Sequence, residues 1–274
     1  MLSEGEGIPA GSAWPRADDA AIVLEGVSKQ YMLSFHKPEA LKTAILHLPT
    51  FLRNGGNRWP FWALSDIDLT VGRGESLGVI GPNGSGKSTL LRIMARIVPP
   101  TKGRVTVRGR ISALLELGAG FHPQISGREN AVLNAVLLGL TLKETRAVLP
   151  QIIEFSELGD FINQPMRTYS SGMYVRLGFA VAVHTRPEVM LVDEVLAVGD
   201  AEFQRKCFSQ IEKLRADDVT IVFVSHDLMA VARFCDRVIL MDHGRISCEG
   251  DAGSVIHEYL SRIARLEAAL SSSS

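Results

Sequence analysis

Apolar residues along this chain follow two spacings, which predict strands and helices in alternation. Strand-like apolar patterns occupy residues 21–27, 62–71, 76–80, 189–192, 219–224, 237–241 and 245–249. Apolar residues three and four positions apart, which are typical of helices, occupy residues 201–215, 228–235 and 252–270. Because strands and helices alternate at this spacing, the pattern favours an α/β fold with a largely parallel sheet covered by helices.

A block of helical pattern lies inside this alternation. Short strands, divided at Gly109, are predicted over residues 103–115, and the spacing of apolar residues turns helical from Gly127 to His184. Strand patterns resume at residue 189. The helical block is therefore predicted to be an inserted subdomain, over residues 116–184.

Polar segments mark the two ends of the pattern and one interruption. Residues 1–20 and 271–274 are expected to be disordered, and residues 1–20 lack the basic start and apolar stretch of a signal peptide. Residues 33–60 form a polar, Pro-punctuated insertion. We expect a short amphipathic helix there, which either packs on its own domain or touches a membrane partner or the headgroup surface. Its apolar stripe consists of Leu41, Ala44, Ile45 and Leu48.

Composition narrows the classes of function. The 274 residues carry a formal net charge of −1, so no global field favours nucleic acid or an acidic membrane. Cys207, Cys235 and Cys248 are scattered without a Cys-x-x-Cys pair, which fits a reducing cytosol better than a disulfide framework. No apolar run approaches the ~20 residues of a membrane span. Any role at a membrane is therefore expected to go through a partner or a surface contact.

Residues 81–89 match the Gly-x4-Gly-Lys-Ser phosphate-loop motif. They follow the apolar run that ends at Ile80 and precede a helical pattern over residues 90–97, the setting that this motif requires. The glycines let successive N–H groups face a triphosphate, and the helix adds its positive N-terminal end. Lys87 is expected to reach the β- and γ-phosphates, and Ser88 to bind Mg²⁺. The predicted nucleotide-binding residues are Gly81, Pro82, Asn83, Gly84, Ser85, Gly86, Lys87, Ser88 and Thr89.

Two carboxylates end the apolar run at residues 189–192. The carboxyl ends of parallel strands meet the crevice where α/β sheets bind ligands, so Asp193 and Glu194 are predicted to lie near the phosphate loop. Asp193 would hold Mg²⁺, directly or through water, and Glu194 would orient and deprotonate the attacking water. The alternative is a solvated acidic strand end, which the neighbouring phosphate loop disfavours.

Two further elements belong to the predicted site. His226 follows the strand pattern over residues 219–224, where it can hydrogen-bond a γ-phosphate, and the absence of His or Cys at metal-ligand spacing around it argues against zinc. Ser170 to Met173 open a helical pattern, and free N–H groups at a helix start can bind an anion. An ordinary N-capped helix has the same pattern.

The order of these elements, over residues 21–251, resembles the nucleotide-binding subunits of ABC (ATP-binding cassette) transporters. The resemblance implies a P-loop NTPase core of the RecA-like type, with an antiparallel β subdomain and the inserted helical subdomain, and ATP and Mg²⁺ as cofactors. Residues 81–89 then look like Walker A, Asp193 and Glu194 like Walker B with its catalytic Glu, and His226 like the switch His. The resemblance further implies that Tyr31 stacks on adenine, that Asp200 is the D-loop Asp, and that the ATP of the other protomer is contacted by Ser170, Ser171, Gly172 and Met173.

Two departures from the family pattern point to one branch. The signature reads Tyr-Ser-Ser-Gly-Met where Leu-Ser-Gly-Gly-Gln is usual. Glu116 stands, by spacing, where a Gln normally links Mg²⁺ to the helical subdomain, and Gln124 is the weaker candidate. Together with residues 116–130 and the insertion at residues 33–60, these features resemble ATPases that export lipid-linked polysaccharides. O-antigen is the first reading, followed by teichoic acid or capsule.

That branch implies a homodimer of ATPase chains with two copies of an integral-membrane permease, at the cytoplasmic face of the bacterial inner membrane. We expect the polysaccharide to be transported without binding to this chain, because only a helical stretch over residues 251–270 follows the cassette pattern. No nucleic acid is expected as a partner. The alternatives are an importer subunit, a non-catalytic regulatory module, and an ABC ATPase without a transporter that acts on nucleic acid or ribosomes. The missing basic patch disfavours the last of these.

Overall fold

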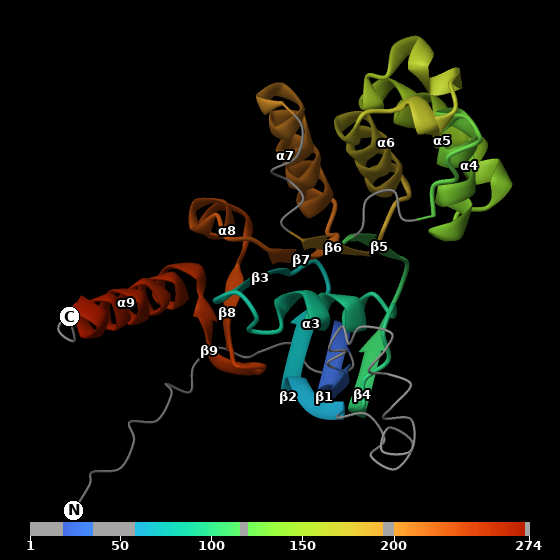
Figure 1. Cartoon of the computed structure of the whole chain (residues 1–274). Helices are drawn as coiled ribbons and strands as arrows, with labels where there is room; N and C mark the ends of the chain where they lie inside the picture. The colour runs from blue at the N-terminus through green and yellow to red at the C-terminus, as the bar shows by residue number, and fades with distance from the viewer. Residues whose placement is uncertain (1–18, 35–57, 116–119, 194–199, 272–274) are drawn as a thin grey trace, which may run out of the picture.

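The computed structural model describes residues 19–34, 58–115, 120–193 and 200–271, which form two β-sheets and several helices (Figure 1). The larger sheet has six strands and the smaller sheet has three. The larger sheet is the central layer, with a hydrophobic core on each of its faces.

Short apolar strands build the six-stranded sheet, as their patterns predict. In sheet order they are β5 (Ile111–Leu114), β6 (Val189–Asp193), β7 (Thr220–Val224), β3 (Ser76–Ile80), β8 (Arg237–Asp242) and β9 (Arg245–Asp251). Neighbours from β5 to β8 are parallel, and β9 pairs antiparallel with β8. Every residue of β3 and of β7 is buried, because the sheet is covered on both faces. The predicted α/β fold is confirmed.

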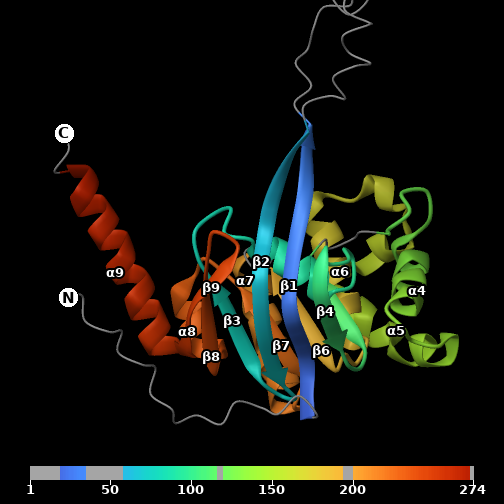
Figure 2. The ribbon, with the colours of Figure 1, turned by 90° about the horizontal axis from the view of Figure 1, so that it is seen from below.

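The three-stranded sheet is antiparallel, and its long strands exceed their predicted lengths. It has the order β2 (Arg58–Gly72), β1 (Ala20–Ser34) and β4 (Lys102–Val107). Leu33 pairs with Trp59 and Ser34 with Arg58, so both ends of the segment assigned to an insertion are strands. Aromatic residues favour such pairing, and Figure 2 shows the β1–β2 ribbon extending past the rest of the fold. The stripe predicted at residues 41–48 lies outside the described residues.

Helix α3 (Lys87–Met94) lies between the two sheets (Figure 1). Strand β6 separates this core from a second one on the opposite face, since Val189 and Leu191 face α3 whereas Met190 and Val192 belong to the other core. The α3 side chains buried between the sheets are Leu90, Leu91, Ile93 and Met94.

The second core contains residues from the remaining helices (Figure 1). The helices that contribute to the second core are α4 (Gly127–Leu137), α5 (Leu142–Ser156), α6 (Ser171–His184), α7 (Ala201–Ala216), α8 (Leu228–Phe234) and α9 (Ala252–Ser271). The 3-10 turns η2 (Gly159–Asn163) and η3 (Met166–Thr168) follow α5. Capping boxes at Ser126 and Thr141 begin helices α4 and α5, because each hydroxyl and the glutamate three residues later satisfy free N–H groups at the helix start. No helix in the described part of the chain is long and apolar enough to span a membrane.

Arg237, at the start of β8, connects four strands or their ends. Its side chain is 5% exposed and forms an ion pair with Glu75, just before β3, at 2.5 Å. It also pairs with Glu249 of β9 and donates a hydrogen bond to the carbonyl oxygen of Thr70 in β2. One buried guanidinium therefore links the large sheet to the small one.

We predict that Arg237→Ala lowers the free energy of unfolding by about 3 kcal/mol or more, because it leaves two poorly solvated carboxylates without their cation. Urea denaturation measures this change. The control is Arg233→Ala, whose pair with Glu212 is well exposed and should contribute less than about 1 kcal/mol. Equal effects of the two substitutions would show that the Arg237 cluster does not hold the sheets together.

Candidate functional site

Backbone pairing aligns the carboxyl ends of three parallel strands. Asp193 of β6 lies opposite Val224 of β7, and Val224 lies opposite Val79 of β3. Because paired strands are about 5 Å apart, the segments that follow them leave the sheet at one edge. This edge therefore carries the loop after Ile80, the Asp193 carboxylate and the turn that contains His226.

Left-handed glycines shape the loop between β3 and α3. The angle φ is +143° at Gly81, +77° at Gly84 and +106° at Gly86, a region that other residues rarely adopt. A Cβ at Gly81 would lie 2.2 Å from the carbonyl oxygen of Met241, and one at Gly86 would lie 2.6 Å from that of Ala63. Strands β8 and β2 thus press directly against the loop. A Cβ at Gly84 would meet no described atom within 4 Å, so the outer side of the loop is open.

Lys87 is the first residue of α3, and its side chain lies over the loop. Its amine donates hydrogen bonds to the carbonyl oxygens of Gly81 and Pro82 at 2.8 and 3.0 Å. Ser88 is exposed next to it at the helix start. The Ser85 hydroxyl is buried and has no hydrogen-bond partner among the described residues. The loop therefore offers a cation and unused hydrogen-bonding capacity.

These groups fit the phosphates of a nucleotide. Backbone N–H groups, the positive end of α3 and an ammonium group all favour an anion here. Mg²⁺ bound with a nucleotide usually takes one or two protein oxygens and completes its shell with phosphate and water, so Ser88 and Asp193 suffice as protein ligands. Within the described ranges, no group of three or more His, Cys, Asp or Glu residues could hold a metal by itself.

The described turn after β7 presents His226. The side chain of His226 is exposed, and Asp193 is half-buried at the end of β6. The N–H of Asp227 donates a hydrogen bond to Ser225 Oγ at 3.0 Å, and the Asp227 carboxylate caps α8. The two residues that flank His226, Ser225 and Asp227, are therefore hydrogen-bonded to each other, and Asp227 is held at the start of α8.

Two predicted site residues, Glu194 and Glu116, lie outside the described residues, and their roles stay predictions. Gln124, the alternative to Glu116, is exposed in the turn before α4. Its backbone N–H donates to Nδ1 of His122 at 3.2 Å, a contact that shapes this turn.

Tyr31 lies on β1, opposite Phe61 of β2. Phe61 is two residues from Ala63, whose carbonyl oxygen packs against the loop at Gly86. The ladder thus holds Tyr31 near the part of β2 that borders the phosphate loop. The ring is half-exposed and Lys29 Nζ lies 5.2 Å from its centre, while its stacking on adenine stays a prediction.

Ser170 to Met173 lie at the N-terminus of α6. Ser170 Oγ accepts a hydrogen bond from the N–H of Met173 at 3.3 Å and caps the helix, and the side chains of Ser170 and Ser171 are exposed. Helix α6 packs in the core on the opposite face of the sheet from α3 (Figure 1). The phosphate loop and the Ser170–Met173 segment therefore begin helices that lie on opposite faces of the sheet.

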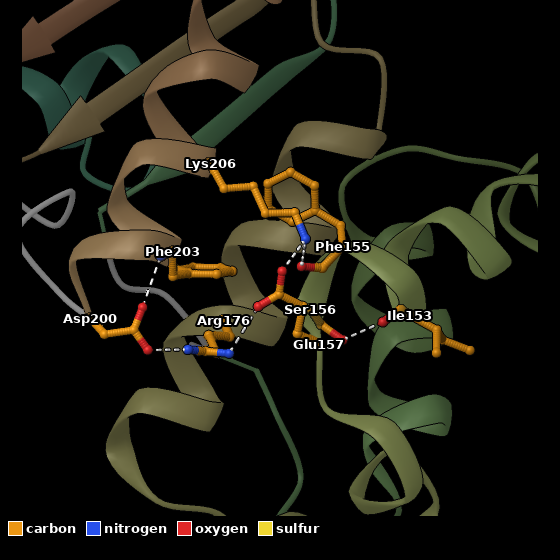
Figure 3. Close-up of polar contacts among 8 residues, drawn as sticks. All are labelled: Ile153, Phe155, Ser156, Glu157, Arg176, Asp200, Phe203 and Lys206. Atoms are coloured by element: carbon orange, nitrogen blue, oxygen red, sulfur yellow. Dashed lines mark hydrogen bonds and ion pairs between the residues drawn. The ribbon is translucent and has the colours of Figure 1, made fainter.

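Asp200, the N-cap of α7, is engaged within its own chain. One carboxylate oxygen accepts from the N–H of Phe203 at 2.8 Å, and the other pairs with Arg176 at 2.5 Å (Figure 3). The Phe203 N–H and, after it, the Arg176 charge hold the pKa of Asp200 below its ordinary value. Arg176 is absent from the predicted site residues. The signal for it is that Arg176 is the only charged residue in residues 171–183, and a charge inside an apolar helix needs a partner.

Comparison with known proteins gives one family. The family model described as ABC transporter matches residues 64–197. The chain is 45% identical over 241 residues to the O-antigen export system ATP-binding protein RfbB of Klebsiella pneumoniae, covering 88% of this chain and 98% of that protein. It is 42% identical over 238 residues to the teichoic acids export ATP-binding protein TagH of Listeria innocua, covering 87% of this chain and 69% of that protein.

A solved structure has the same fold. An ATP-binding cassette, solved as a dimer in a post-hydrolysis state with ADP and Pi, matches with a TM-score of 0.66 and 23% identity, over 84% of this chain and 98% of that chain. The P-loop NTPase type of fold expected from the sequence is thereby confirmed.

We predict that Lys87→Ala weakens ATP binding about tenfold or more, because a charge-assisted contact to phosphate is lost. Titration with a fluorescent ATP analogue measures the affinity. Thermal unfolding without nucleotide should change little, whereas the stabilisation by added ATP should shrink. Lys213→Ala, which removes an exposed lysine of α7, is the control. Unchanged affinity in Lys87→Ala would place the nucleotide elsewhere.

Proposed function

This chain belongs to the ABC transporter family as an ATP-hydrolysing subunit, and we propose that it powers the export of a lipid-linked polysaccharide. The observation that carries the proposal is the 45% identity to an O-antigen export ATP-binding protein across 98% of that protein's length. An O-antigen-like cargo ranks before teichoic acid, because RfbB of Klebsiella pneumoniae matches at 45% identity over 98% of its length, whereas TagH of Shouchella clausii matches at 42% over 64% of its length.

The residues of the phosphate loop and of the neighbouring strand ends would each have a separate role in ATP hydrolysis. The backbone N–H groups of residues 83–86 and the Lys87 amine would bind the β- and γ-phosphates, which requires the amine to leave the carbonyl oxygens it contacts here. Ser88 and Asp193 would hold Mg²⁺, which neutralises charge on the phosphates when it is bound. Glu194 would orient the attacking water and take its proton, and His226 would hydrogen-bond the γ-phosphate.

The proposed working unit is a symmetric pair of chains. Within one chain, α3 and α6 lie on opposite faces of the large sheet, which supports a role for Ser170 to Met173 at the nucleotide of a second protomer. An isologous pair gives each ATP a phosphate loop from one chain and a helix N-terminus from the other. The added N–H groups would stabilise charge on the transferring phosphoryl group.

Coupling to transport needs a membrane partner. We propose that two copies of an integral-membrane permease bind the pair at the cytoplasmic face of the inner membrane, and that closing and opening of the pair moves the permease helices. An ABC ATPase acting on nucleic acid is disfavoured by the net charge of −1.

We predict that Glu194→Gln lowers ATP turnover about 10²–10⁴-fold while ATP binding persists, because the amide cannot accept the proton of water. In the organism that encodes this chain, deleting its gene should stop surface display of one polysaccharide, and the lipid-linked form should accumulate at the cytoplasmic face of the inner membrane. Expression of the unaltered chain should restore display, and Glu194→Gln should not. Incorporation of radiolabelled sugar into surface polysaccharide and into the lipid-linked form inside the cell measures both effects.

Glu212→Gln is the matched control, since this exposed glutamate of α7 pairs with Arg233 on the surface. It should restore display as the unaltered chain does. Normal surface polysaccharide in the deletion strain would contradict the proposed cargo, and full turnover in Glu194→Gln would show that another group activates the water.

A further inference from the structure

Four charged side chains connect helices α5, α6 and α7 (Figure 3). Arg176 of α6 pairs with Glu157 at 3.3 Å and with Asp200 at 2.5 Å. Lys206 of α7 pairs with Glu157 at 2.6 Å and donates a hydrogen bond to the carbonyl oxygen of Phe155 at 3.0 Å. Cations and carboxylates alternate along this cluster, so each neutralises its neighbour.

Arg176 occupies the centre of the cluster. Its side chain is 21% exposed, and its guanidinium lies 4.9 Å from the centre of the ring of Phe203, which is buried. A guanidinium is planar and presents its donors in a fixed fork. Stacking on Phe203 therefore fixes the directions in which Arg176 holds its two carboxylates, which a lysine could not reproduce.

The two carboxylates both mark helix ends. Glu157 is the C-cap of α5, in a left-handed conformation with φ +55°, and Asp200 is the N-cap of α7. Arg176 lies less than two turns after Ser170, the N-cap of α6. One side chain thus links the end of α5, the beginning of α6 and the start of α7.

The cluster borders the surface that carries the signature residues. Arg176 and Asp200 line a cavity of about 410 Å³ together with Ser170, Gly172 and Met173. In the chain, Asp200 follows the strand that ends at Asp193 by seven positions. The segment expected to hold Mg²⁺ in one site is therefore connected, through Asp200 and Arg176, to the segment expected to complete the other site.

We propose that Arg176 is a positioning residue for the ATP site of the partner protomer. It fixes the start of α6 to the start of α7, so that Ser170 to Met173 are presented to the partner's nucleotide in a set relation to the chain's own phosphate site. This inference rests on the proposed paired function. Arg176 itself acts through Asp200 and Glu157 and does not need to touch ATP.

A purely structural role of Arg176 would predict a loss of folding stability on substitution, whereas the positioning role does not. Ion pairs with exposed members contribute little to stability, and the side chains of Asp200 and Glu157 are 60% and 43% exposed. Loss of Arg176 should therefore leave folding and the chain's own ATP binding nearly unchanged. A misplaced signature segment, in contrast, loses charge-assisted contacts to the partner's nucleotide, which is expected to weaken ATP-driven assembly about tenfold or more.

The first test compares Arg176→Gln, Arg176→Lys and Arg233→Gln. Arg233 is a matched control, since it also pairs with a carboxylate of α7 at 2.6 Å and lies 5.2 Å from the centre of a phenylalanine ring. Each change is made in the Glu194→Gln chain, and light scattering gives the ATP concentration needed for dimers. Arg176→Gln should raise that concentration about tenfold or more, Arg176→Lys should raise it less, and Arg233→Gln should not raise it.

Binding of a fluorescent ATP analogue and the melting temperature are measured on the same chains, and both should match the parent in Arg176→Gln. A fall in melting temperature that accounts for the lost dimer would make Arg176 an ordinary fold residue and overturn the proposal. Equal dimerisation of Arg176→Gln and Arg233→Gln would also overturn it. If the parent binds ATP yet forms no ATP-driven dimer, both the paired function and this assignment fail.

The second test separates the two sites by mixing chains. A dimer of Arg176→Gln with Lys87→Ala has one site built from an intact phosphate loop and an intact signature segment, whereas its other site carries both defects. The mixture should hydrolyse ATP faster than the sum of its separate components. No gain would mean that Arg176 serves the ATP site of its own chain. The reference is Lys87→Ala mixed with the Arg233→Gln chain, which also provides one site with both parts intact.

Discussion

Parallel pairing of β3, β6 and β7 is the constraint on which the proposed chemistry depends. Register places Asp193, Val224 and Val79 side by side, so segments more than a hundred residues apart in sequence leave the sheet at one edge. Close contacts with β2 and β8 then leave room only for glycine at Gly81 and Gly86. The anion site is therefore a consequence of sheet packing, and its backbone N–H groups need no side chain to direct them.

The same sheet separates the two halves of the proposed site. Helix α3 is enclosed between the sheets in one core, and α6 packs with the other helices in the second core. A chain with this architecture presents a phosphate-binding loop and an exposed helix N-terminus on helices from different faces of the sheet. Pairing two chains is the simplest way in which both can meet one nucleotide, and a symmetric pair does so twice.

Local patterns predicted most of the fold, while the roles assigned to the site residues stay predictions. Residues 76–80 are bounded correctly because a buried parallel strand is a continuous apolar run followed by a glycine-rich turn. The extension of β1 and β2 was not predicted, because the backbone pairing of Leu33 with Trp59 joins two segments that are distant in sequence, and no local pattern shows it. The pair of Arg176 with Asp200 was missed for a similar reason, since the packing of α6 against α7 decides which carboxylate meets the guanidinium.

Cross-linking between the two halves of the site tests the central claim most directly. Burial raises the pKa of Cys207 and Cys235 to about 12, so their thiols stay unreactive, and Cys248 can be replaced by serine. Asn83→Cys and Ser171→Cys then place one exposed thiol on the phosphate loop and one on the signature segment. With a short bismaleimide, we expect covalent dimers when ATP is present, few without ATP, and few in the Lys87→Ala chain. Links that form equally without ATP, or only within single chains, would contradict a nucleotide site shared between two chains.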